Sequence, residues 1–184
     1  GKLLITGDAG HTSSDSSEIF LTRLTSNGPP DQSFGTNGIL ILNISTRTDV
    51  ANEILYDEIR QKIIVAGYSE KTGSRRFALL RFNPDGQFDQ SFGSNGLVIT
   101  TPSTGWAAGD AAALQADGKI VTLGHIFNGA SYDFAFTRHI QDDINPVEDV
   151  PQVDWFHVSI QPNPVINSYH LIYSLPESCR VSAD

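Results

Sequence analysis

The chain has 184 residues, of which 39% are hydrophobic, so it has enough apolar content to form a core and is not wholly disordered. Its 12 Lys and Arg against 21 Asp and Glu give a net charge of −9, which disfavours binding to nucleic acid or to an anionic membrane. The single cysteine, Cys179, excludes an internal disulfide and a cysteine-based zinc cluster. No apolar run approaches the ~20 residues that a membrane-spanning helix needs. With 16 Gly, 9 Pro and no Met, the composition favours a turn-rich protein made of strands.

Short strand-like segments follow one another along the chain in a repeating order. Apolar, β-branched stretches bounded by Gly, Pro, Asn and Asp predict strands rather than helices, and no helical period persists over ten residues. The middle copy of the repeat is the most complete. Its four predicted strands are residues 62–66, 77–82, 96–100 and 110–114.

The strongest repeat lies between the second and third of these strands. Residues 25–38 (TSNGPPDQSFGTNG) and 83–96 (NPDGQFDQSFGSNG) are offset by 58 and identical at 8 of 14 positions. The middle copy opens with Asn83-Pro84-Asp85-Gly86, which predicts a type I turn because Pro presets φ and Gly accepts the positive φ that follows. We therefore expect the two segments to form equivalent hairpins.

Four strands per repeat of about 58 residues, arranged radially, predict a β-propeller, which closes with about 4–8 blades. The repeats begin in mid-repeat at Gly1 and stop near His139, after about two and a half copies. We therefore expect residues 1–140 to be a fragment of a larger propeller. Its four-stranded sheets are predicted to start with residues 2–6, 62–66 and 119–123.

The motifs of the middle copy resemble the delta-60 repeats of secreted bacterial β-propeller proteins. The matching positions are residues 83–86, Asp89, residues 91–93, Gly96 and residues 115–119. The first copy departs from the pattern at Pro29 and Pro30, and the third lacks the turn. Since that family has no established enzymatic role, the resemblance implies a secreted scaffold and no reaction.

The remainder of the chain differs in composition. Residues 141–154 hold five acidic residues, no basic residue and two prolines, which predicts a linker. Residues 155–184 resemble the start of a type A C-terminal sorting domain of the type IX secretion system, with Pro162, Asn163 and Pro164 as its core motif. The resemblance implies the first strands of a truncated immunoglobulin-like β-sandwich. It also implies that type IX machinery exports the protein across the outer membrane of a Gram-negative bacterium, to be secreted or anchored at the cell surface.

Three residue types recur at matched positions and are predicted to be structural. Each of the three repeated apolar stripes ends in an arginine, and eight residues later the two complete copies have an aspartate. We expect a buried Arg–Asp pair in each complete blade and a phenylalanine anchoring each hairpin, while Arg138 finds its acceptor at Asp142 or Asp143. The structural set is Arg23, Asp31, Phe34, Arg81, Asp89, Phe92 and Arg138.

The sequence predicts no catalytic, cofactor-binding or metal site. The five histidines lack metal-ligand spacing and are expected at the surface or in turns, and the acidic run 8–18 is expected to be a solvated hairpin loop. Trp106, expected in a loop, could stack on a sugar ring. We therefore expect a non-enzymatic binding or adhesion module for an extracellular glycan or protein. The alternative is an extracellular hydrolase, or an accessory module to one, that acts on polysaccharide or peptide.

Overall fold

The computed structural model describes residues 1–10, 16–101, 106–141, 156–161 and 170–174. All regular structure in this part of the chain is β, so the all-β prediction is confirmed. The described residues contain no helix long and apolar enough to span a membrane. The strands are β1 (Leu3–Gly10), β2 (Ser17–Leu24), β3 (Ile39–Leu42), β4 (Asp49–Asp57), β5 (Lys62–Lys71), β6 (Ser74–Phe82), β7 (Leu97–Thr100), β8 (Trp106–Leu114), β9 (Ile120–Phe127), β10 (Tyr132–His139), β11 (Phe156–Gln161) and β12 (His170–Ser174).

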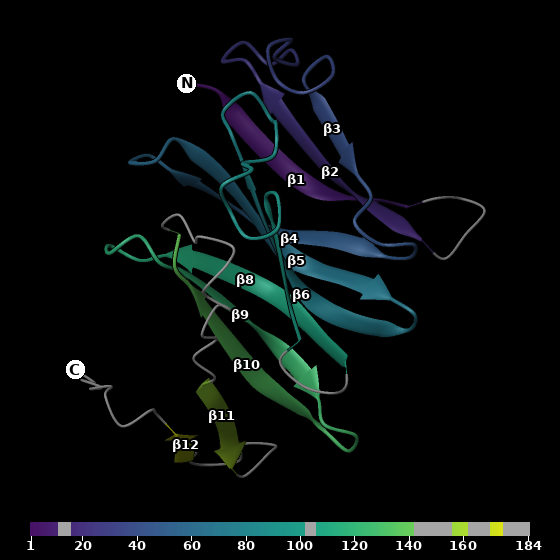
Figure 1. Cartoon of the computed structure of the whole chain (residues 1–184), viewed down its shortest axis with the longest axis vertical. Coiled ribbons are helices and arrows are strands. Elements are labelled where there is room, and N and C mark those ends of the chain that lie inside the picture. Colours follow the sequence, from purple (N-terminus) through teal and green to yellow (C-terminus); the bar gives the residue numbers. More distant parts are fainter. Residues whose placement is uncertain (11–15, 102–105, 142–155, 162–169, 175–184) are drawn as a thin grey trace.

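The described strands form three antiparallel sheets that follow one another in chain order (Figure 1). The first has the order β1-β2-β3, the second β4-β5-β6-β7 and the third β12-β11-β10-β9-β8. Neighbouring sheets lie face to face, with β1 against β4 and β8 against β4, β5 and β6. This stacking of small antiparallel sheets is consistent with part of a propeller.

The predicted grouping of strands into sheets is wrong by one strand. Residues 62–66 do not open the second sheet, because β4 precedes them and pairs with β5 from Asp49↔Ser69 to Asp57↔Lys62. Likewise, residues 110–114 belong to β8, which pairs with β9 and opens the third sheet. Short turns join β4 to β5 and β8 to β9, so each of these pairs folds as a hairpin. The period of a repeat does not say where one sheet ends and the next begins.

The two complete hairpins have the same backbone geometry. Asp31 N donates to Arg23 O at 2.8 Å and Asp89 N to Arg81 O at 2.9 Å, with the same offset of 58. The left-handed positions also coincide, because φ is 55° at Asn37 and 56° at Asn95. The predicted equivalence of these hairpins is confirmed. The predicted turn also forms, with Gly86 N donating to Asn83 O at 3.0 Å.

The core lies between the sheets, and β5 contributes to it on both faces. Ile63 and Val65 belong to a cluster that also includes Ile19 and Leu21 of β2, and Phe34 of the loop between β2 and β3. Ile64 and Ala66 belong to a second cluster with Ile120 of the third sheet. Burial on both faces explains why β5 begins with an uninterrupted apolar run instead of an alternating one.

The tail supplies the last two strands of the third sheet, β11 next to β10 and β12 at the edge. β11 pairs with β10 through Phe134↔Val158, at the place where β7 pairs with β6 through Phe77↔Thr100. The third repeat lacks the turn that leads to β7 in the second, and β11 covers the edge of β10. The described start of the predicted sorting segment, β11, therefore pairs with the third sheet. Pro162, Asn163 and Pro164 lie outside the described residues.

Candidate functional site

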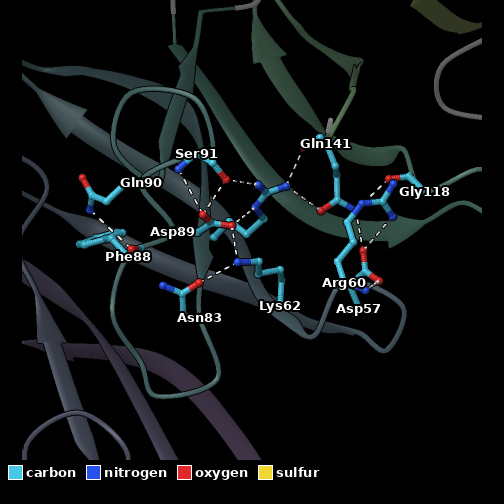
Figure 2. A network of polar contacts seen from close by, with 11 residues as sticks. Asp57, Arg60, Lys62, Asn83, Phe88, Asp89, Gln90, Ser91, Gly118 and Gln141 are labelled. Carbon is cyan, nitrogen blue, oxygen red and sulfur yellow. Dashed lines mark hydrogen bonds and ion pairs between the residues drawn. The ribbon is translucent and has the colours of Figure 1, made fainter. Parts of the chain in front are cut away.

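A buried polar network joins the second and third sheets around Arg81. Arg81 Nε donates to Asp89 Oδ2 at 2.9 Å, and the Arg81 side chain is only 3% exposed. Lys62 Nζ lies 2.9 Å from the same oxygen. Figure 2 shows Asp89, Ser91 and Lys62 on one side of the network, with Gln141 and Asp57 on the other. The predicted Arg–Asp pair is present, and it lies inside the protein.

The planar guanidinium group of Arg81 could make two parallel hydrogen bonds to the carboxylate of Asp89, but it makes only one. Only Nε reaches Asp89, while Nη2 donates to Ser91 Oγ at 3.2 Å. The second carboxylate oxygen, Asp89 Oδ1, accepts from Ser91 N at 3.1 Å and from Ser91 Oγ at 2.7 Å. Ser91, in the turn that follows Asp89, therefore takes up the second carboxylate oxygen. The nitrogens of the Arg81 guanidinium group donate to different partners.

Nη1 of the same arginine reaches the next copy of the repeat. Arg81 Nη1 donates to Gln141 O at 2.8 Å and Gln141 Oε1 at 3.2 Å. In the first sheet, Arg23 pairs with Asp31 at 2.7 Å, and its Nη1 donates to Pro84 O. Pro84 and Gln141 occupy matched positions of successive copies, so each arginine connects its own hairpin to the following sheet.

Sequence reasoning missed Gln141, which it placed at the start of the linker. Its side chain is buried, and Nε2 donates to Asp57 Oδ2 at 2.9 Å and to Gly118 O at 2.8 Å. The first residue of the predicted linker is thus part of the inter-sheet network, while residues 142–154 lie outside the described chain. No local signal marks Gln141, because its partners are 23 to 84 residues away.

The charges of the network keep its aspartates ionised. Burial alone would raise the pKa of Asp89, but hydrogen bonds from Lys62 and Ser91 outweigh it and lower the pKa to about 2. Hydrogen bonds from Lys2 and Ser33 likewise hold the pKa of Asp31 well below its usual range. Both carboxylates are therefore acceptors at neutral pH and not proton donors.

The repeated phenylalanines lie beneath the arginines. Phe34 is fully buried, and the guanidinium carbon of Arg23 lies 4.7 Å from the centre of its ring. The corresponding distance from Arg81 to Phe92 is 4.5 Å. A stacked cation adds to the apolar burial of each ring. These contacts occupy the arginines and phenylalanines within the scaffold.

The third arginine differs from the other two. Arg138 is exposed, and its charge contributes to lowering the pKa of Asp117, although the main cause there is a hydrogen bond from Lys119. Its expected acceptors, Asp142 and Asp143, lie outside the described residues. The expectation that histidines lie at the surface is wrong for His139, which is 5% exposed and lies with Nε2 at 2.8 Å from Thr137 Oγ1.

A second group of side chains, called the aromatic patch, lies away from the Arg81 network. It gathers at the start of β6, β8 and β10 and at the end of β9. Trp106 opens β8 and is not in a loop, which corrects the sequence-based expectation. The guanidinium carbon of Arg75, from β6, lies 4.1 Å from the centre of the Trp106 ring and 4.6 Å from that of Tyr68. The patch consists of Tyr68, Arg75, Trp106, His125, Phe127 and Tyr132.

Polar groups and exposed ring faces occur together in the aromatic patch. Tyr132 is 57% exposed, and its ring lies 5.4 Å from that of His125 and 5.2 Å from that of Phe127. His125 Nδ1 lies 2.7 Å from Asp110 Oδ2, on the exposed side of the sheet. The patch thus combines rings that can stack with a histidine and a carboxylate that can form hydrogen bonds. Among the described residues, no cluster of His, Cys, Asp or Glu could hold a metal ion.

These features define a propeller-like repeat protein. A family model described as a domain of unknown function (DUF5122) β-propeller matches residues 1–34 and 62–92. Both stretches end at the equivalent buried phenylalanines, Phe34 and Phe92, so the family match follows the repeat that the structure contains. No curated protein matches the chain.

Proposed function

We propose that this chain is a non-enzymatic binding or adhesion module built on delta-60-type propeller blades, and that its partner docks on the aromatic patch. The observation that carries this proposal is the group of tilted and edge-to-face rings formed by the half-buried Trp106 and His125 and the exposed Tyr132, beside Asp110. Buried repeat residues serve the scaffold, whereas these side chains occur in one sheet and are half-buried or exposed. A ligand site of a repeat protein is expected where the repeats differ.

The chemistry of the patch favours a glycan. A sugar ring offers C–H groups to an aromatic face and hydroxyl groups to a carboxylate or imidazole, and both kinds of contact are available here. The net charge of −9 disfavours a polyanion such as nucleic acid. We therefore expect a neutral or amino-bearing extracellular glycan.

Trp106→Ala is expected to weaken glycan binding by about tenfold or more, since it removes the ring that Arg75 and His125 flank. A glycan array identifies the ligand of the unmodified chain, and titration calorimetry then measures its affinity for the variants. Tyr56→Ala is the matched control, because Tyr56 is an exposed aromatic residue at the end of β4 and does not belong to the aromatic patch. Glycan binding that tolerates Trp106→Ala, or the absence of any glycan ligand, would contradict the proposal.

The same proposal includes export by the type IX secretion system to the medium or to the cell surface. Its support is the resemblance of residues 155–184 to the start of a sorting domain. A periplasmic reporter that carries a complete version of this domain is expected to be secreted by a strain with a working type IX system. Replacing Pro162, Asn163 and Pro164 by alanine is expected to retain the reporter in the periplasm. Retention of the unmodified fusion would refute the export assignment.

A further inference from the structure

Three polar side chains of the second sheet form one row across β4, β5 and β6. Asp49 of β4 lies directly opposite Ser69 of β5, and Ser69 lies directly opposite Arg76 of β6. Residues that face each other in an antiparallel sheet have their side chains on the same face, with Cβ atoms about 4.5–5.5 Å apart. The three side chains therefore stand next to one another on one face of the sheet.

Each side chain of this row has a buried polar atom that no described residue satisfies. Asp49 is 0% exposed and Ser69 is 1% exposed, whereas Arg76 is half-buried. Asp49 Oδ1, Ser69 Oγ and Arg76 Nε are buried and have no hydrogen-bonding partner among the described residues. A buried polar group without a partner is costly, so three such groups side by side indicate that something polar lies between them.

The row lies on the face of the second sheet that the first sheet covers. The next row on this face, two residues further along each strand, consists of Ala51, Gly67 and Ala78. Both alanines belong to the core cluster that the second sheet shares with β2. Ser17 Oγ, at the start of β2, donates to Asp49 O at 3.1 Å. The row is therefore part of the interface between the first and second sheets.

The second carboxylate oxygen fixes the side chain of Asp49. Asp49 Oδ2 accepts from Ile44 N at 2.7 Å and from Ser45 N at 2.9 Å. These bonds hold the carboxylate against the segment that leads from β3 to β4. Oδ1 therefore cannot turn away from its buried position unless both bonds break.

The repeat does not require polar side chains in this row. In β8 and β9 the positions that correspond to Asp49 and Ser69 hold Ala107 and Ile126, since each pair stands two residues before the last pair that precedes the bulge. Ala107 is fully buried, and Ile126 packs against its cluster. An apolar pair thus serves the scaffold in the third sheet, so the polar pair of the second sheet has another role.

We propose that one water molecule is bound between Asp49, Ser69 and Arg76 as a permanent part of the interface between the first and second sheets. Water donates to Asp49 Oδ1, accepts from Arg76 Nε and exchanges a hydrogen bond with Ser69 Oγ, so that all three atoms are satisfied. Buried waters usually make about three hydrogen bonds. The guanidinium group of Arg76 disfavours a cation in the same place, and the carboxylate of Asp49 disfavours an anion.

A high-resolution crystal structure of the full chain tests the site directly. We expect one ordered water at hydrogen-bonding distance, about 2.7–3.2 Å, from Asp49 Oδ1, Ser69 Oγ and Arg76 Nε. A direct hydrogen bond between Arg76 and Asp49, or a site without an ordered water, would overturn the proposal.

Two variants of equal size test the site in solution. Ser69→Thr keeps the hydroxyl group that bonds to the water, whereas Ser69→Val places a methyl group there and leaves Asp49 Oδ1 and Arg76 Nε poorly satisfied. We expect the Thr variant to melt several degrees above the Val variant in thermal denaturation followed by circular dichroism. In a dry site the additional buried methyl group would instead make the Val variant melt at least as high as the Thr variant, which would contradict the proposal.

Ile126 supplies the matched control, because it occupies the corresponding position of the third sheet and packs against an apolar cluster. Ile126→Val is expected to melt above Ile126→Thr. An opposite order at residue 69 therefore reports on the bound water and not on a general preference of β-strands for threonine. The same order of the Thr and Val variants at both positions would count against the water site.

Discussion

Arg81→Ala is expected to lower the free energy of unfolding by about 3 kcal/mol, as is usual when one partner of a buried ion pair is removed. The substitution deletes the contact to Asp89 at 2.9 Å and leaves that carboxylate buried. It also removes the donors to Ser91 and Gln141, so the second and third sheets lose a direct connection. Lys62 remains beside Asp89 and limits the loss. Urea denaturation followed by circular dichroism measures the change.

A double-mutant cycle separates the energy of the Arg81–Asp89 pair from that of the surrounding polar network. Arg81→Ala combined with Asp89→Ala is expected to cost less than the sum of the two single changes, because no buried charge is left without its partner. Arg138→Ala is the matched control, since this arginine occupies the same repeat position but is exposed, and surface changes usually alter stability by less than about 0.5 kcal/mol. Equal losses for Arg81→Ala and Arg138→Ala would show that the repeated arginines are not structural.

Mild acid is expected to destabilise the protein through His139. Burial lowers the pKa of His139 from 6.5 to about 4 in the folded state. The unfolded chain therefore takes up a proton on this residue below pH 6.5, while the folded protein does so only near pH 4. Stability falls as the pH decreases through this window. The difference between the unfolded and folded pKa of His139 corresponds to about 3 kcal/mol of stability lost across this window.

His139→Gln is expected to flatten the stability profile between pH 6.5 and 4, which urea titrations at several pH values measure. Asp89 acts in a lower window, because its folded pKa of about 2 means that its contribution is complete above pH 3.8 and is lost as the pH falls toward 2. The two groups can therefore be distinguished by pH alone. A wild-type profile that is flat between pH 6.5 and 4 would contradict the assignment to His139.

The local features of this fold were predictable from the sequence because they depend on neighbouring residues. Glycine and asparagine at residues 35–38 and 93–96 specify the positive φ values of the repeated turn, and short β-branched segments specify strands. The Arg–Asp pairs were predictable for the same reason, since Asp89 follows Arg81 by eight residues within one hairpin. The aromatic patch was not predictable, because Arg75 and Trp106 belong to different sheets and approach each other only in the folded chain.

Sheet membership and the connections between sheets were decided by the tertiary structure. A 58-residue period is compatible with any choice of first strand, and only the pairing of β4 with β5 and of β8 with β9 shows where each sheet begins. Gln141 reads as linker in the sequence, yet it lies buried between Arg81 and Asp57, which are 60 and 84 residues away. Turn chemistry acts over a few residues and is visible in the sequence. Packing between sheets joins distant residues, so it becomes visible only when the chain is folded.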